Sequence, residues 1–117
     1  MITVAETRMF QRKVARLLSE HEREDLVTYL AEYPNTGIIM EETGGIRKLR
    51  WARSGRGKSG GLRVIYYFHD ESMPLYLLTV FGKNEKANLS KEERNSLAAA
   101  VKKLVAFRRQ RNEQSIH

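Results

Sequence analysis

The sequence contains no cysteine and only two prolines among its 117 residues. Without cysteine, neither disulfides nor thiolate chemistry can support the fold or a reaction, which suits a reducing compartment. The scarcity of proline argues against long disordered stretches. No apolar run approaches the ~18 residues that a bilayer crossing requires, and the N-terminus has no apolar signal-peptide region. We therefore expect a cytoplasmic protein with no membrane contact.

The length and the apolar content are those of one domain. A chain of 117 residues, 41% of them hydrophobic, can bury one modest core and is too short for two. There are no internal repeats, linkers or low-complexity tracts. We predict a single domain over residues 1–117, with a polar tail that is flexible beyond about residue 108.

Acidic residues are missing from one long stretch. The chain has 21 Lys and Arg against 14 Asp and Glu, a net charge of +7. The segment RKLRWARSGRGKSGGLR, residues 47–63, holds seven of the basic residues and no acid, so the remainder is balanced at 14 against 14. A solvated loop is the simpler interpretation of a short basic run. An excess of this size in one place instead indicates a surface that binds a polyanion.

Three helices are predicted from apolar spacing. The apolar residues after Ala5 form one helical stripe: Phe10, Val14, Leu17 and Leu18. Ser19 and Glu22 have capping-box spacing, so a second helix begins there and runs to Tyr33. Ser90 and Glu93 repeat this spacing before a last helix, whose apolar stripe is Leu97, Val101, Leu104 and Val105.

Three runs of strand-forming residues lie between these helices, at Ile46–Ala52, Leu62–Phe68 and Leu75–Phe81. Residues 2–4 are a candidate for a further short strand. Because runs of helices and runs of strands stay separate, we predict the α+β class. The expected architecture is a compact antiparallel sheet with the two N-terminal helices and the C-terminal helix packed on one face. The other face would be left partly open.

Strand alternation sorts the charges by face. Lys48 and Arg50 share one face of the first long strand, and Arg63 shares its face with Ile65 and Tyr67 on the next strand. Unpaired cations inside a helix-covered core would be costly, so the charged face should be the open one. If the strands form a meander, Lys83, just past the third strand, joins these cations on one surface.

Aromatic rings and a glycine-rich loop accompany the cations. Tyr67 and Phe81 would offer planes on which bases stack, although ordinary strand packing is the alternative for either ring. The loop of residues 54–61 adds Arg56 and Lys58 on a backbone with four glycines, which we interpret as a basic flap, with a plain hairpin loop as the alternative. Basic groups interleaved with aromatic rings fit single-stranded RNA. Scattered histidines and the lack of HxxxH or CxxC spacing argue against a metal site.

Three motifs, in order, resemble the RelE/HigB superfamily of bacterial toxins, and specifically its HigB-like branch. They are the strand GGIRKLR, the loop and strand GRGKSGGLR, and the hydrophobic strand ending in GKNE. The resemblance implies a compact α+β fold and an mRNA interferase, an endoribonuclease that enters the ribosomal A site and cuts the mRNA there without a cofactor. It also implies a co-expressed antitoxin, which we expect to be a small helix-turn-helix protein that binds DNA.

The motifs also imply roles for single residues. Arg63 matches the family arginine at the start of the central strand, and its fork-shaped, always charged group is the best candidate to hold the phosphate transition state. Lys48 and Arg50 match the basic pair of the preceding strand, and Lys58 and Lys83 match the loop and GKNE lysines. The candidate catalytic residues are thus Arg63, Lys83, Lys58 and Glu85. The candidate RNA-binding residues are Lys48, Arg50, Arg56, Tyr67, Phe81 and Asn84.

Attack of a ribose 2′-OH on its adjacent phosphate needs no metal, only a base, charge stabilisation and a proton for the leaving 5′ oxygen. Lys83 or Lys58, crowded by other cations, are the candidates for proton exchange, and Glu85 is a fallback base. No Tyr or His follows Lys83 before His117, and Asn84 stands where some relatives carry Arg, so the general base is left open. A site without a strong general acid-base pair fits an enzyme that relies on ribosomal RNA to position the mRNA.

Two other hypotheses remain. A non-catalytic RNA- or ribosome-binding module would use the same basic sheet face. A free ribonuclease acting on naked RNA is the third, and the absence of a histidine pair counts against it. Products with 2′,3′-cyclic phosphate ends would distinguish an enzyme from a binding module.

Overall fold

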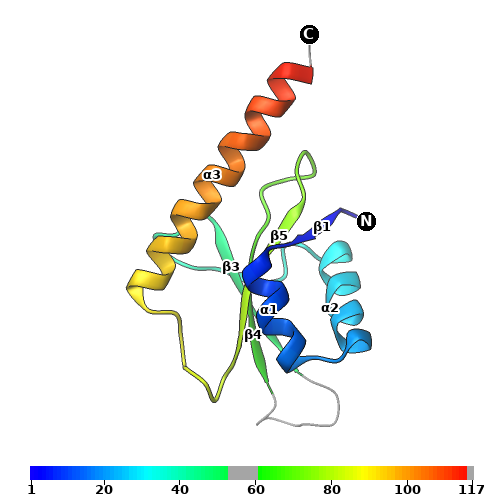
Figure 1. Cartoon of the computed structure of the whole chain (residues 1–117), viewed down its shortest axis with the longest axis vertical. Coiled ribbons are helices and arrows are strands. Elements are labelled where there is room, and N and C mark those ends of the chain that lie inside the picture. Colours follow the sequence, from blue (N-terminus) through cyan, green and yellow to red (C-terminus); the bar gives the residue numbers. More distant parts are fainter. Residues whose placement is uncertain (53–60, 116–117) are drawn as a thin grey trace.

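The computed structural model describes residues 1–52 and 61–115. Within these residues, five strands form one sheet in the order β1-β5-β4-β3-β2, and three helices pack around it (Figure 1). The strands are β1 (Val4–Glu6), β2 (Ile38–Ile39), β3 (Ile46–Trp51), β4 (Leu62–Tyr67) and β5 (Leu75–Gly82). The helices are α1 (Arg8–Leu17), α2 (Glu20–Glu32) and α3 (Lys91–Ser115). The predicted α+β class is confirmed.

Residues with hydroxyl side chains cap the N-termini of the helices. Thr7 accepts a hydrogen bond from a backbone N–H in the first turn of α1 at 3.3 Å. At the start of α2, Ser19 and Glu22 each accept from the other's backbone N–H. Ser90 and Glu93 make the same reciprocal pair before α3. Both predicted capping boxes are confirmed, and they satisfy donors that a helix terminus otherwise leaves unpaired.

The sheet carries a hydrophobic core on each face. Along β4, Val64 and Tyr66 belong to the cluster formed with α1 and α2, whereas Ile65 and Tyr67 belong to the cluster that contains residues of α3. Because successive strand residues point to opposite faces, α1 and α2 cover one face and α3 covers the other. The expectation that all three helices share one face is therefore wrong. A helical apolar stripe predicts that a helix is covered, but not which face of the sheet covers it.

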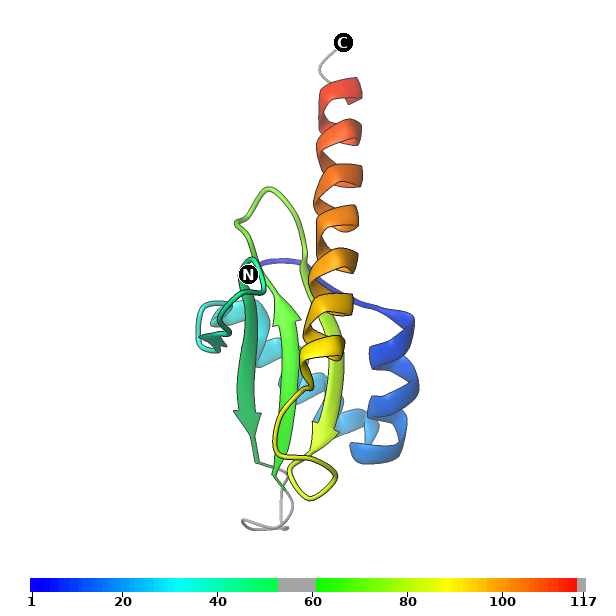
Figure 2. The same cartoon turned by 90° about the vertical axis from the view of Figure 1, so that its left-hand side faces the viewer.

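The α3 face is only partly covered. In Figure 2, α3 runs in front of β5, and β3 has no helix over it on this side. The buried α3 residues in this core are Leu97 and Val101. On β3, Arg50 is exposed and Lys48 is half-buried. The charged face is therefore partly open, although it is not the helix-free face that was expected from the sequence.

The first strand makes the sheet mixed. β1 runs parallel to β5, with Val4 opposite Leu75, while the other pairings are antiparallel. The expectation of an antiparallel sheet holds for β2 to β5 and needs correction at this edge. A three-residue strand is too short to show alternation, so its pairing could not be derived from the pattern.

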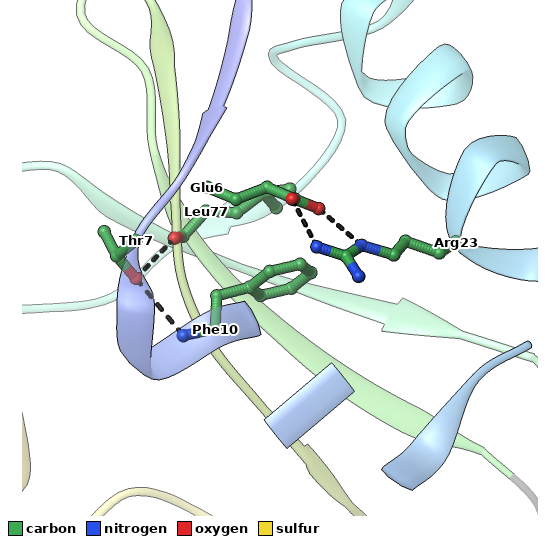
Figure 3. A network of polar contacts seen from close by, with 5 residues as sticks. All are labelled: Glu6, Thr7, Phe10, Arg23 and Leu77. Carbon is green, nitrogen blue, oxygen red and sulfur yellow. Dashed lines mark hydrogen bonds and ion pairs between the residues drawn. The ribbon is translucent and has the colours of Figure 1, made fainter. Parts of the chain in front are cut away.

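Polar contacts fasten β1 to its neighbours (Figure 3). The guanidinium group of Arg23 in α2 donates two hydrogen bonds to Glu6, at 2.8 and 2.5 Å. The hydrogen bond from Arg23 lowers the pKa of Glu6. The hydroxyl group of Thr7 donates to the carbonyl oxygen of Leu77 in β5 at 2.9 Å. A forked, charge-assisted pair thus joins β1 to α2 while Thr7 joins it to the sheet.

The last helix extends beyond the sheet (Figure 1). α3 has 25 residues, and its buried contacts end at Val101, with Leu104 and Val105 partly buried. Phe107 is 56% exposed. The tail beyond residue 108 is helical to Ser115, and its flexibility stays a prediction. Among the described residues, no helix combines the length and apolar character needed to cross a membrane.

Candidate nucleic-acid interface

Two arginines face each other across neighbouring strands. Arg50 of β3 and Arg63 of β4 are directly paired in the sheet register. Like charges in this arrangement destabilise a sheet. Arg63 is half-buried and donates one hydrogen bond of 3.3 Å to the carbonyl oxygen of Leu62, and Arg50 is exposed. Neither forms an ion pair within residues 1–52 or 61–115. The pair therefore presents guanidinium donors to an anion from outside.

Lys48 lies on the same face, two residues before Arg50 on β3. Its ammonium group donates a hydrogen bond of 2.9 Å to Oδ1 of Asn88, in the loop between β5 and α3. This contact draws the loop toward the open side of β3. The register thus agrees with the alternation argument that placed Lys48, Arg50 and Arg63 together.

A turn after β5 brings Lys83 to the same end of the sheet. Its backbone N–H donates to the carbonyl oxygen of Gly61 at 3.1 Å, immediately before β4. Arg63 is the direct partner of Phe81 on β5, two residues before Lys83. Cations from β3, β4 and the turn after β5 are therefore gathered at one end of the sheet.

Lys86 is a further cation at this end, and it was not among the residues predicted from the sequence. Its ammonium group lies 5.1 Å from the centre of the Phe81 ring and 2.5 Å from Oε2 of Glu93. The hydrogen bond from Lys86 lowers the pKa of Glu93 to about 2. Glu93 also caps α3, so one carboxylate joins the loop to the helix. The available signal was the position of Lys86 directly after the GKNE motif.

The two aromatic rings that were expected to stack on bases are buried. Phe81 is 0% exposed and Tyr67 is 6% exposed. Burial raises the pKa of Tyr67. Tyr67 pairs with Ile46, at the opposite end of β4 from Arg63. Neither ring offers a base an open face, so the packing alternative describes both, and the expected aromatic platform is corrected.

Asn84 and Glu85 follow Lys83 in an exposed turn. Glu85 borders a groove together with Lys13 and Arg16 of α1, which covers the other face of the sheet. The fallback base is thus on the α1 side of the turn and is not brought between the two arginines. The predicted flap residues Arg56 and Lys58 lie outside the described residues.

The chemistry that suits this surface is phosphate binding. Guanidinium groups bind phosphate oxygens through forked pairs of hydrogen bonds. The same groups can stabilise charge that develops on a phosphate during a reaction. In the described part of the chain, no three His, Asp or Glu side chains are grouped so that they could hold a metal ion. Arginine and lysine, rather than carboxylates, dominate the site.

Comparison with known proteins gives the family. The family model of the RelE toxin of the RelE/RelB toxin-antitoxin system matches residues 3–117. The chain belongs to the RelE toxin family. A solved structure of an alanine mutant of the E. coli toxin RelE in the free state is similar, with a TM-score of 0.53 and 17% sequence identity. The match covers 85% of this chain and 95% of that one, and at this identity it supports the fold alone.

Membership of the RelE family makes this protein the toxin of a toxin-antitoxin system and implies an antitoxin partner. The narrower assignment to the HigB-like branch stays a prediction. On the RelE-like sheet of this member, Arg50 and Arg63 are direct partners in neighbouring strands.

Proposed function

We propose that this RelE-family toxin is a ribosome-dependent endoribonuclease that cuts mRNA in the A site and so inhibits translation. The observation that supports this most is the Arg50–Arg63 pair, because two neighbouring arginines without an ion pair among the described residues are stabilised when a phosphate binds between them. Its substrate is mRNA bound to translating ribosomes, so it would act in the cytoplasm. It uses no cofactor.

The proposed reaction is attack of a ribose 2′-OH on the adjacent phosphate. A bond forms from the 2′ oxygen to phosphorus as the bond to the 5′ oxygen breaks, which leaves a 2′,3′-cyclic phosphate and a 5′-OH. A base takes the 2′ proton and an acid gives one to the 5′ oxygen. Arg63, with Arg50 and Lys48 beside it, stabilises the charge that builds up on the phosphate oxygens.

Lys83 and Lys58 are the proposed proton-exchanging groups, with Glu85 in reserve. Arg56 and Asn84 add contacts to the RNA. Because this set includes no histidine pair, ribosomal RNA must supply part of the positioning, and geometry contributes much of the rate in such reactions. Slow or absent cleavage of naked mRNA follows from this assignment.

The test is to incubate purified protein with translating ribosomes and with the same mRNA alone. We expect cuts on the ribosome that end in 2′,3′-cyclic phosphate, mapped by primer extension and end-group analysis. Equal cleavage of naked mRNA would instead indicate a free ribonuclease.

A non-catalytic ribosome-binding module is the second candidate. It is favoured by the position of Glu85 beside Lys13 and Arg16 of α1, because the fallback base is then not directed toward the arginine pair. Such a module would bind ribosomes and yield no cyclic phosphate ends.

We also propose the nature of the antitoxin. A small helix-turn-helix protein would silence the toxin with an acidic or apolar segment that covers the basic face or displaces α3. Overproduction of the toxin alone should stop growth, and co-expression of the antitoxin should restore it.

A further inference from the structure

A groove of about 330 Å³ lies beside β3, between β2 and the loop that precedes α3. Its apolar wall includes Ile38, Met40 and Leu89, and its polar rim consists of Lys48, Asn88, Arg94 and the carboxylate of Glu41. Ile38 is 75% exposed, although large aliphatic residues are among those most often buried. Of these residues, only Lys48 has a part in the proposed cleavage.

The sheet register directs Ile38 toward the cations. Ile38 is the direct partner of Lys48, and partners in adjacent strands share a face. Arg63 is two strands away from Ile38 and two residues along the strand direction, so their backbones are roughly 12 Å apart by ideal strand spacing. Ile38 is thus beside the phosphate-binding pair without touching the same phosphate. A neighbouring nucleotide of the same RNA strand would reach it.

The rim of the groove is rich in hydrogen-bond donors. The bond from Lys48 to Oδ1 of Asn88 fixes the amide group, so the amide N–H groups are the end that can meet a ligand. Arg94, in the first turn of α3, makes no ion pair among the described residues. An apolar wall for the face of a ring and donors for its edge are the two elements that bind a planar base.

We infer that the groove formed by Ile38, Met40 and Asn88 is a subsite for one nucleobase of the mRNA, next to the cleaved phosphate, and that it influences which sequence is cut. The inference rests on the proposed function, because Lys48 and Arg63 must hold the same RNA strand. The rim has two cations, Lys48 and Arg94, against the one carboxylate of Glu41, and Lys48 continues it toward the arginine pair, which favours RNA over a protein segment. Since donors dominate the rim, an acceptor-rich base such as guanine is the expected occupant.

The test compares Ile38→Ala with Ile39→Ala. Ile39 also borders the groove and is 52% exposed, but its partner is Arg47. Arg47 in turn pairs with Tyr66 of the α1–α2 core, so the Ile39 side chain is directed to the other face. Each variant cuts an mRNA library randomised at the A-site codon on translating ribosomes, and the cut sites are sequenced. Ile38→Ala should reduce discrimination between bases at one codon position by about fivefold or more, and Ile39→Ala should keep the wild-type profile.

An unchanged profile for Ile38→Ala would overturn the subsite. An equal change in both variants would also overturn it, because the effect would then not depend on the face that Ile38 occupies. If the profile of Ile38→Ala is unchanged and its binding to the antitoxin is weaker, β2 contacts the antitoxin and not the RNA. A second measurement does not need cleavage: the methyl NMR signals of Ile38 and Ile39 are followed while short single-stranded RNA is added. A larger shift at Ile38 supports the subsite even if wild type cuts no RNA, in which case only the proposed cleavage fails. If wild type cuts no RNA and the Ile38 signal does not respond, the subsite is overturned.

Discussion

Position 37 leaves no room for a side chain. A Cβ atom on Gly37 would lie 2.8 Å from the ring and from the hydroxyl oxygen of Tyr66. The Gly37 backbone and the Tyr66 side chain come this close because the Gly37 N–H donates a 2.8 Å hydrogen bond to the Tyr66 hydroxyl, which itself donates to the carbonyl oxygen of Pro34 at 2.9 Å. A buried tyrosine thus anchors the turn that leads into β2.

Gly37→Ala is therefore expected to lower the free energy of unfolding by about 1–3 kcal/mol, because the Tyr66 ring or the turn has to move. Urea denaturation measures the change. Gly82→Ala is the matched control, since a Cβ atom there meets nothing within 4 Å, and it should change stability by less than about 0.5 kcal/mol. Equal stabilities of the two variants would show that the turn adapts freely.

Arg63→Ala separates binding from chemistry. The side chain lies on the α3 face, so its neighbours Leu62 and Val64 keep their places in the opposite core. Loss of a phosphate clamp that acts mainly in the transition state should slow single-turnover cleavage at saturating ribosomes by about a hundredfold. Arg8→Ala, exposed on α1, is the control and should cut at the wild-type rate. If Arg63→Ala also cuts at that rate, Arg63 serves in binding alone.

For single residues, the sequence predicted which face of the sheet a side chain occupies better than it predicted whether a helix buries that side chain. The period of two along a strand was sufficient to group Lys48, Arg50 and Arg63. The same period says nothing about what packs on a face, and so the burial of Phe81 and Tyr67 beneath α3 did not follow from it. Lys86 was missed because it belongs to a loop, where no period applies.

Among the elements, the loop of residues 83–90 is joined to α3 by a charged contact. Lys86 and Ser90 both bond Glu93 in the first turn of α3. The hydrogen bond from Lys86 is the main cause of the lowered pKa of Glu93, about 2. A carboxylate whose pKa is lower in the folded state stabilises the fold above its unfolded pKa and loses this effect as the pH falls through the folded value.

Glu93→Gln is accordingly expected to flatten the acid dependence of stability. Between about pH 5 and about pH 2, the wild type should lose more free energy of unfolding than the variant. Glu92→Gln is the control, because Glu92 lies in the same first turn and makes no ion pair among the described residues. Denaturant titrations at a series of pH values give the comparison. Parallel curves for wild type and Glu93→Gln would contradict the assignment.

The elements that were predicted correctly carry strong local signals. Two capping boxes marked the starts of α2 and α3, and β-branched and aromatic runs marked β4 and β5. β1 and β2 have three and two residues, too few for any period to show. Their places in the sheet are set by contacts with residues distant in the sequence, which a local pattern does not contain.

For the molecule as a whole, positive charge is not confined to residues 47–63. Residues 102–111 contain five Lys and Arg and no acid. The charges outside residues 47–63 balance only in total, because eight of the 14 acids precede residue 43. The projecting part of α3 therefore carries a second basic surface away from the sheet.

Association with RNA should consequently depend strongly on salt. Raising the salt from about 50 to about 200 mM should weaken binding to ribosomes or to single-stranded RNA by about tenfold or more, because counterions are released for each phosphate contacted. Binding titrations at several salt concentrations measure the slope. An affinity that does not change with salt would argue that phosphates are not what this surface contacts.

The parallel pairing of β1 with β5 also bears on the order in which the chain is made. Val4 cannot pair until Leu75 has been synthesised. The apolar faces of α1 and α2 likewise cannot be covered until β4 and β5 have left the ribosome. The cationic end of the sheet needs the loop of residues 83–90 as well. The nascent toxin therefore stays incomplete on the ribosome that synthesises it until most of the domain has emerged, and the surface proposed to bind RNA does not exist before then.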